Sequence, residues 1–269
     1  MASGVANMSM TLQYGPDSSN VGDLYLPTCP SPRVVALLHG GFWRMPHGRD
    51  QMSPIAEDLR SRGLAVWNIG YRRIGEPQVG WPEIASDVLA ALAFLYEFNE
   101  REHRLDLSQF ALIGHSAGGQ LALACTSDRM RRDHPRGRQL RFRPAVVVAL
   151  AAVTDLEAAF ETNLGDGAAR SLLGGTPSGH PDRYASASPH RLLPHGSKQL
   201  LLHGLRDEAV PISQSRRYAR AARLLGDDVS CVELQDSGHM DFLDPLSSAH
   251  GTLCDRLLGS MGTAERRFG

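Results

Sequence analysis

The sequence lacks most of the features that mark secreted, membrane-spanning and metal-binding proteins. Its 269 residues include only four cysteines, and neither these nor the 11 histidines show metal-ligand spacing. No run of about 18 apolar residues could span a bilayer. The start, "MASGVANMSMTLQYG", has neither the basic segment nor the apolar core of a secretory signal. We therefore expect a cytoplasmic protein with reduced thiols, no membrane association, no metal and no other cofactor.

An excess of charge of either sign is also missing. Lys and Arg total 28, Asp and Glu total 29, and the formal net charge is -1, so no overall field attracts nucleic acid or anionic lipid. One basic segment, "RMRRDHPRGRQLRFR" (129–143), contains Pro135 and Gly137 and is interpreted as a solvated loop, with an anionic partner as the alternative. The predicted partner is a small-molecule substrate and not nucleic acid, and a homodimer is left open.

Short, almost continuously apolar runs alternate with segments of helical periodicity. Such runs are typical of strands buried on both faces of a parallel sheet. The predicted strands are 34–39, 64–69, 110–115, 145–150, 199–203 and 229–234, and the predicted helices are 52–59, 82–95, 213–225 and 246–257, the third capped by Ser213. This alternation predicts a doubly wound, mostly parallel α/β fold.

Two segments depart from this alternation. "MSMTLQYG" (8–15) and "NVGDLYLP" (20–27) indicate an antiparallel hairpin at the edge of the sheet. Residues 155–195 are rich in Gly, Pro, Ser and His, and we interpret them as a small cap or lid inserted between two strands. Because this segment is interpreted as an insertion and not as a separate domain, residues 1–269 are expected to form a single domain.

The stretch "LIGHSAGGQ" (112–120) places Ser116 between a predicted buried strand and a predicted helix. A glycine two residues to either side, Gly114 and Gly118, suits a sharp strand–turn–helix connection that presents a serine nucleophile. At the helix N-terminus, the N–H of Ala117 points toward any anion that forms at the serine. A G-x-S-x-G pattern alone is weak, so the serine needs a base and an acid elsewhere in the chain.

Both partners follow later predicted strands on the same edge of the sheet. Asp207 lies in "LLLHGLRDEAVP", after the next-to-last strand, and His239 lies in "LQDSGHMDF", after the last one. The order Ser, Asp, His is that of the α/β-hydrolase scaffold. The competing acids near these positions are Glu208, Asp236 and Asp241. The segment "HGGFW" (39–43) supplies a candidate oxyanion loop, in which the N–H groups of Gly41 and Phe42 join that of Ala117 and His39 braces the loop.

Four segments together resemble the α/β-hydrolase superfamily of serine hydrolases: "HGGFW", "GHSAGG", "LLLHGLRDEAVPISQS" and "SGHMDF". Within it, the chain is similar to the hormone-sensitive-lipase and kynurenine-formamidase-like (arylformamidase-like) esterases over about residues 12–258. The resemblance implies the α/β-hydrolase fold and a cofactor-free serine mechanism. Lipase-like relatives often carry a third glycine where this chain has Phe42, and read "YRLAPE" where it has "YRRIGE" (71–76). These departures disfavour a lipase.

The leading interpretation is therefore a serine hydrolase that cleaves small esters or N-formyl arylamides through an acyl-enzyme. The alternatives are a small prolyl-oligopeptidase-like peptidase or amidase and a non-catalytic ligand receptor on the same fold. Substrate contacts are expected from the residues that flank the motifs, with simple packing or ion pairing as the competing interpretation: Trp43, Arg44, Tyr71, Trp81 and His115. Arg72 and Arg73 either bind a substrate carboxylate or pair with Glu76 and Asp87.

Overall fold

The computed structural model describes residues 9–261, which form one eight-stranded sheet in the order β1-β2-β4-β3-β5-β6-β7-β8. The strands from β3 to β8 are parallel to their neighbours, whereas β1 pairs with β2 and β2 pairs with β4 in the antiparallel sense. Their bounds are β1 Ser9–Gln13, β2 Val21–Tyr25, β3 Arg33–Leu38, β4 Ala65–Ile69, β5 Asp106–His115, β6 Val146–Leu150, β7 Lys198–Gly204 and β8 Val229–Leu234. The predicted mostly parallel sheet with an antiparallel N-terminal hairpin is confirmed.

Strands β3, β4 and β6 are apolar at almost every position because both faces of the sheet are covered. In β3, Val34, Ala36 and Leu38 pack into one core, and Val35 and Leu37 pack into the core on the opposite face. Because side chains alternate between the two faces of a strand, a strand with two covered faces needs apolar residues at every position. This explains why the apolar runs of the sequence locate the strands within a few residues.

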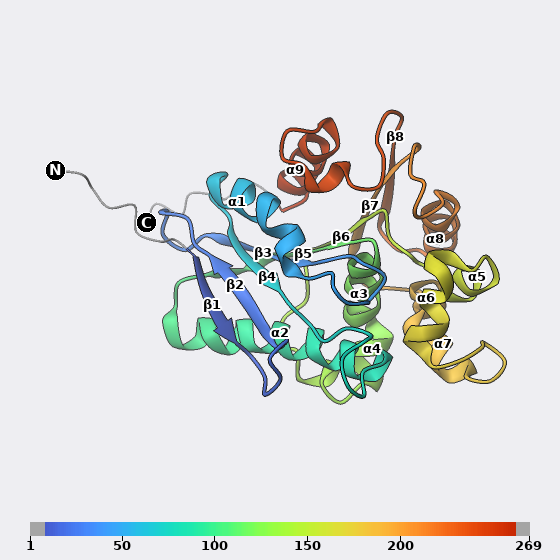
Figure 1. The fold of residues 1–269 in the computed structure, drawn as a ribbon. Coiled ribbons are helices and arrows are strands. Elements are labelled where there is room, and N and C mark those ends of the chain that lie inside the picture. Colours follow the sequence, from blue (N-terminus) through green and yellow to red (C-terminus); the bar gives the residue numbers. More distant parts are fainter. Residues whose placement is uncertain (1–8, 262–269) are drawn as a thin grey trace.

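The helices form the two layers that cover the sheet (Figure 1). The core on one face contains side chains of α1 (Ser53–Ser61) and α9 (Ser248–Ser260). The core on the other face contains those of α2 (Trp81–Glu102), α3 (Ala117–Thr126) and α8 (Ser213–Leu224). The short helix α4 (Asp128–Asp133) follows α3, so residues 129–133 of the segment interpreted as a loop are helical instead. No described helix is both long enough and apolar enough to cross a membrane.

The predicted cap segment lies between β6 and β7 and contains α5 (Leu156–Glu161), α6 (Leu164–Leu173) and α7 (Pro181–Ala187). Figure 1 shows these helices in yellow, gathered beside α3 and α8. The start of α6 has unusual backbone geometry, because Asn163, Gly165, Asp166 and Gly167 all have positive φ angles between 51° and 69°. Consecutive left-handed residues are rare outside glycine and are held in place by surrounding contacts.

Several local predictions need correction. Ser213 is the first residue of α8 and not its N-cap, because Ile212 occupies that position. The last helix begins at Ser248, where Ser247 accepts a hydrogen bond from the His250 N–H, and Leu246 lies outside the helix and is 94% exposed. The predicted hairpin begins at Met8, and the predicted single domain includes residues 1–8 and 262–269; these positions lie outside the described residues.

Candidate active site

Ser116 occupies the sharp turn between β5 and α3, as the sequence predicts. Its φ of 56° and ψ of -117° are strained for a residue with a side chain, which is typical of a serine presented at the carboxyl end of a strand. The flanking glycines are a steric requirement: a Cβ on Gly114 would lie 2.0 Å from the Gly118 carbonyl oxygen, and a Cβ on Gly118 would lie 2.2 Å from that of Leu38. The chain can therefore make this turn only with glycine at both positions.

The loop after β3 runs directly past this serine. A Cβ on Gly40 would approach the Ser116 Cβ to 3.1 Å, so the two backbones are in close contact. Gly41, Phe42 and Trp43 all have positive φ angles, and the Arg44 N–H donates to the Gly41 carbonyl, closing a tight turn. Among residues 9–261, the N–H groups of Gly41, Phe42 and Ala117 donate no hydrogen bond to another protein group. They remain available to an anion.

His39 and Tyr71 support this loop through a ring stack and a hydrogen bond. The two rings stack with centroids 4.1 Å apart and planes within 4°, and the Tyr71 hydroxyl donates to the His39 carbonyl at 2.7 Å. Burial lowers the pKa of His39 to about 3, so its ring is neutral at physiological pH. This arrangement agrees with the predicted bracing role of His39. It also gives Tyr71 a supporting role, and the predicted substrate contact of Tyr71 stays a prediction.

The candidate base and acid meet in the loops that follow the last two strands. His239 Nδ1 lies 2.7 Å from Asp207 Oδ2, and the Asp207 side chain is only 1% exposed. The three competing acids are placed differently: Glu208 is exposed, Asp236 pairs with Arg206, and Asp241 accepts from the Gly238 N–H at 2.9 Å. Of these four acids, Asp207 is therefore the one that contacts the His239 ring.

The Asp207 carboxylate is surrounded by hydrogen-bond donors. Oδ1 accepts the N–H groups of Ala209 at 2.9 Å and Val210 at 2.8 Å, while Oδ2 lies within 3.2 Å of His203 Nε2 in addition to His239. Burial alone would raise the pKa of Asp207, but these hydrogen bonds outweigh it and hold the pKa well below its usual range. The carboxylate is therefore ionised, as the orienting acid of a triad must be.

No hydrogen bond joins the side chains of Ser116 and His239 among the described residues, but the residue before Ser116 contacts His239. His115, which precedes Ser116, has its ring centroid 4.7 Å from that of His239, and its Nε2 lies 2.9 Å from the His239 carbonyl oxygen. Catalytic hydrogen bonds are often long without substrate and tighten in the complex. Burial, together with the nearby His239, lowers the pKa of His115 to about 3. A neutral His115 therefore anchors the His239 loop, and its predicted substrate contact stays a prediction.

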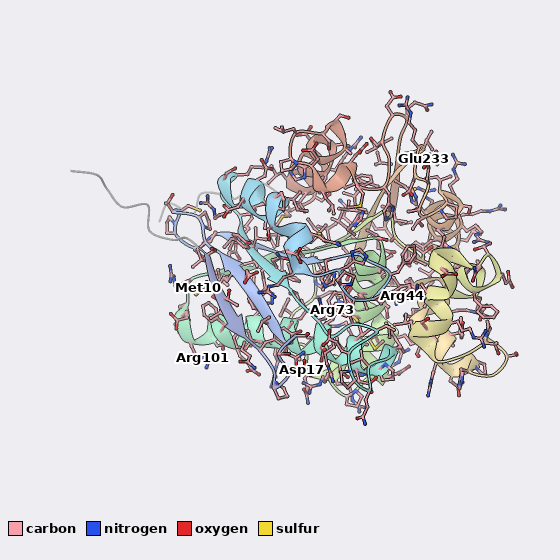
Figure 2. The ribbon with its side chains drawn as sticks, viewed as in Figure 1. Met10, Asp17, Arg44, Arg73, Arg101 and Glu233 are labelled. Carbon is pink, nitrogen blue, oxygen red and sulfur yellow. The ribbon has the colours of Figure 1, made fainter. Side chains whose placement is uncertain are left out.

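Trp43 and Arg44 connect the oxyanion loop to the rest of the protein. Trp43 is 1% exposed, and its indole N–H donates to Gln120, whose own amide donates to the Ala187 carbonyl of the cap. The Arg44 guanidinium donates to the carbonyls of Gly165 and Asp166 and to the Ser171 hydroxyl, all at 2.9 Å. Figure 2 shows Arg44 beside the yellow cap helices. These contacts give both residues a structural role, and their substrate contacts stay predictions.

The neighbouring arginines form the ion pairs that the sequence offered as the alternative to substrate binding. Arg72 contacts the buried carboxylate of Asp87 at 2.7 Å, and Arg73 contacts Glu76 at 2.9 Å. Each guanidinium therefore already has a carboxylate partner.

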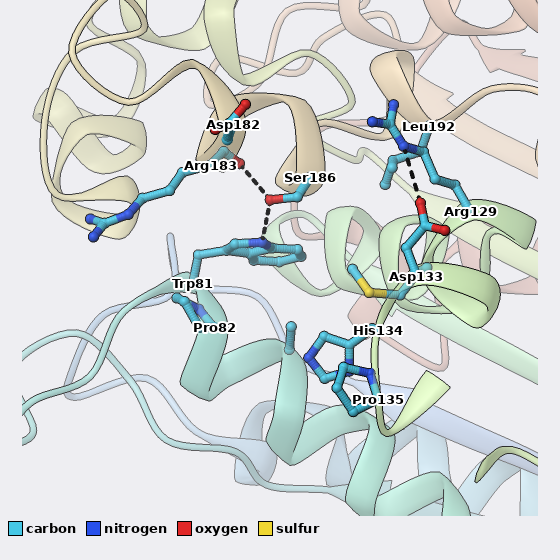
Figure 3. A pocket seen from close by; sticks show the side chains of 12 residues that line it. Trp81, Pro82, Arg129, Asp133, His134, Pro135, Asp182, Arg183, Ser186 and Leu192 are labelled. Atoms are coloured by element: carbon cyan, nitrogen blue, oxygen red, sulfur yellow. Dashed lines mark hydrogen bonds and ion pairs between the residues drawn. The ribbon is translucent and has the colours of Figure 1, made fainter. Parts of the chain in front are cut away.

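Trp81 lines a separate cavity of about 420 Å³ between the start of α2, helix α4 and the cap (Figure 3). Its indole N–H donates to the Ser186 hydroxyl at 3.2 Å, and Met130 and Leu192 add apolar surface. None of Ser116, Asp207 and His239 lines this cavity. The role of Trp81 in substrate binding therefore stays a prediction.

One cluster could hold a metal ion by its ligand types. Asp58, His250 and Cys254 bring an oxygen, a nitrogen and a sulfur within 4.8 Å of one another, between α1 and α9. The Asp58 carboxylate is already neutralised by Arg62, whose Nε lies 2.6 Å from the same oxygen that contacts His250. We interpret the cluster as a hydrogen-bond network between two helices.

The four cysteines are free, and Cys231, predicted to be buried, is only partly so.

The strand order, the strained serine turn and the Asp–His pair at one edge of the sheet define a member of the α/β-hydrolase superfamily. The family model BD-FAE matches residues 23–221, and the chain belongs to that family. Among curated proteins, esterase LipC of Mycobacterium tuberculosis is 27% identical over 86% of this chain, and kynurenine formamidase of Danio rerio is 30% identical over 45% of it. The chain spans 59% of the length of LipC and 39% of that of the formamidase.

Solved structures share the fold at low sequence identity. A truncated carbohydrate esterase from gut microbiota superposes with a TM-score of 0.80 at 22% identity, covering 94% of this chain and 96% of that one. Esterase 2 of Thermogutta terrifontis, phosphonylated by sarin, superposes with a TM-score of 0.75 at 20% identity, covering 94% of this chain and 95% of that one. The predicted superfamily and fold are confirmed.

Proposed function

We propose that this chain is a carboxylic ester hydrolase in which Ser116, His239 and Asp207 form the catalytic triad. The observation that carries the proposal is the 2.7 Å contact between His239 Nδ1 and the buried, ionised Asp207, at the sheet edge where Ser116 occupies its strained turn. An aspartate bonded to Nδ1 leaves Nε2 free to accept the proton of a serine hydroxyl.

In this mechanism Ser116 Oγ attacks the ester carbonyl while His239 Nε2 takes its proton. The oxyanion that forms is bound by the free N–H groups of Gly41, Phe42 and Ala117, each donor being worth about 10²–10³ in rate. Protonated His239 then passes its proton to the leaving alcohol, and an acyl-enzyme remains on Ser116. Water activated by His239 hydrolyses the acyl-enzyme and restores the serine.

Esters are the favoured substrates because the relatives that align over most of this chain carry esterase names, LipC among them. Hydrolysis of an N-formyl arylamide is the second candidate. It is supported by the likeness to kynurenine formamidase over 123 residues. The two reactions use the same triad and differ in the leaving group, an alcohol or an arylamine.

The test compares initial rates at pH 7.5 on p-nitrophenyl acetate, butyrate and octanoate and on N-formylkynurenine, with Ser116→Ala as the blank. We expect ester turnover that falls with acyl length and drops about 10⁴-fold or more in Ser116→Ala. Formamide turnover well above that of the esters would replace the ester assignment by the second candidate. A fluorophosphonate probe that fails to label Ser116 in the wild type would overturn the triad itself.

A further inference from the structure

His203 is a buried histidine beside the triad that the proposed mechanism does not yet use. It lies in β7, four residues before Asp207, and its side chain is fully buried. A fully buried histidine needs hydrogen-bond partners, because burying an unpaired ring nitrogen costs free energy. Its partners are therefore informative about its role.

The surroundings of the His203 ring determine which nitrogen carries the proton. Nε2 lies 2.9 Å from the Val210 carbonyl oxygen and 3.2 Å from Asp207 Oδ2, and both of these atoms can only accept. Nδ1 lies 2.8 Å from the Ser215 hydroxyl, which can donate. Neutral His203 consequently has its proton on Nε2, which donates to the Val210 carbonyl and faces Asp207 Oδ2, and accepts from Ser215 at Nδ1.

We propose that His203 is a positioning residue of the triad, acting as a second histidine N–H donor to the Asp207 carboxylate. With this bond, Oδ2 accepts from His239 and His203 while Oδ1 accepts from the N–H groups of Ala209 and Val210. These donors fix the plane of the carboxylate and spread its charge, so that Oδ2 is held toward His239. The inference rests on the proposed hydrolase function.

Other titratable groups lie near His203, Asp207 and His239, and their titration must be considered when the pH dependence of activity is interpreted. His115 of β5 lies beside His239, and burial keeps its ring neutral. Glu233 of β8 is the register partner of His203 and is paired with Arg216 of α8 at 2.6 Å. Asp241 accepts from the Gly238 N–H in the loop that carries His239.

The experiment measures kcat/KM on p-nitrophenyl butyrate from pH 5 to 9 for the wild type, His203→Leu, His203→Gln and Ser215→Ala. Without the His203 donor, the Asp207 charge is less dispersed and stabilises protonated His239 more strongly. We expect the acidic limb of His203→Leu to move by about 0.5 pH unit or more to higher pH, and kcat to fall about tenfold. The Gln amide can replace the donor and should return the limb toward that of the wild type.

Ser215→Ala is the matched control, because it removes the hydrogen-bond partner of His203 Nδ1 and leaves the contact between His203 Nε2 and Asp207 in place. An equal shift in Ser215→Ala and His203→Leu would show that only the packing of this corner matters and would overturn the inference. An unshifted limb in a folded, active His203→Leu would do the same. If the wild type has no activity and no labelled Ser116, the failure lies with the proposed function and not with His203.

A measurement on the wild type covers the case in which His203→Leu does not fold. In ¹⁵N-histidine NMR spectra, assigned by the loss of one ring in His203→Gln, we expect His203 to be the Nε2–H tautomer at pH 7.5. A proton on Nδ1 instead would mean that Nε2 does not donate to Asp207, and the inference would be wrong.

Discussion

Replacing Asp207 with asparagine tests the geometry of the site, because each carboxylate oxygen has donors that an amide cannot satisfy in the same way. An asparagine must place its NH₂ group on one of the two positions. At the Oδ1 position the NH₂ would face the N–H groups of Ala209 and Val210, which are backbone donors and cannot accept a hydrogen bond. The NH₂ group is therefore forced to the Oδ2 position, opposite His239.

An NH₂ group at that position needs an acceptor, so His239 must accept at Nδ1 and hold its proton on Nε2. In that tautomer Nε2 cannot take the proton of Ser116. His203 would face the same NH₂ group with its own Nε2–H, which adds an unfavourable contact at 3.2 Å. The expected loss in kcat is about 10⁴-fold, equivalent to about 5.5 kcal/mol of transition-state stabilisation.

The assay is the steady-state hydrolysis of p-nitrophenyl butyrate, with circular dichroism to check that the variant folds. Asp236→Asn is the matched control: Asp236 is exposed, pairs with Arg206 on the surface, and should keep wild-type activity. If Asp207→Asn stays within tenfold of the wild type while folded, Asp207 does not orient the base. Loss of activity in Asp236→Asn instead would move the acid to that position.

Three further substitutions test other parts of the structure. Gly118→Ala puts a Cβ 2.2 Å from the Leu38 carbonyl and should lower the free energy of unfolding in urea by about 2–3 kcal/mol, whereas Gly251→Ala, with open space around it, should not. Arg44→Ala releases three hydrogen bonds to the cap and should lower kcat/KM about tenfold, with faster limited proteolysis of the cap. Burial lowers the pKa of His195 from 6.5 to about 4, so only the unfolded chain takes up this proton between those values and stability falls as pH drops through that window. Between pH 7.5 and 5.0, His195→Gln should therefore lose about 2 kcal/mol less stability in urea than the wild type.

Much of the scaffold can be predicted from sequence because its physical causes are local. Strands buried on both faces are mostly apolar, and each predicted strand agrees with the structure within a few residues, except that β5 begins earlier, at Asp106. Ser116, Asp207 and His239 can be predicted to lie at one edge of the sheet, because each follows a strand and the strands from β3 to β8 run parallel to one another. The tight turn at Ser116 also leaves a local signal in its glycines.

The hydrogen-bond partners of Arg44 and Trp43 could not be predicted, because they depend on contacts between distant segments. Arg44 donates to Gly165 and Asp166, more than 100 residues away, through carbonyls exposed by a left-handed turn that only the folded cap creates. The partner of Trp43, Gln120, reads in the sequence as an ordinary polar residue of a helix. The sequence therefore left substrate contact and structural support as open alternatives at these positions.

His203 is an intermediate case, since the sequence did carry a signal. His203 ends the apolar run "LLLH", so its polar ring must find hydrogen-bond partners in the core. Asp207 lies four residues later, where the chain turns back after the strand and brings the carboxylate close to the ring. What the sequence lacks is the direction of the ring, which places Nε2 2.9 Å from the Val210 carbonyl oxygen and 3.2 Å from Asp207 Oδ2. In this proposal Asp207 is positioned both by His203, in the preceding strand, and by the N–H groups of its own loop. A substitution in β7 that turns the His203 ring should therefore impair catalysis without touching substrate.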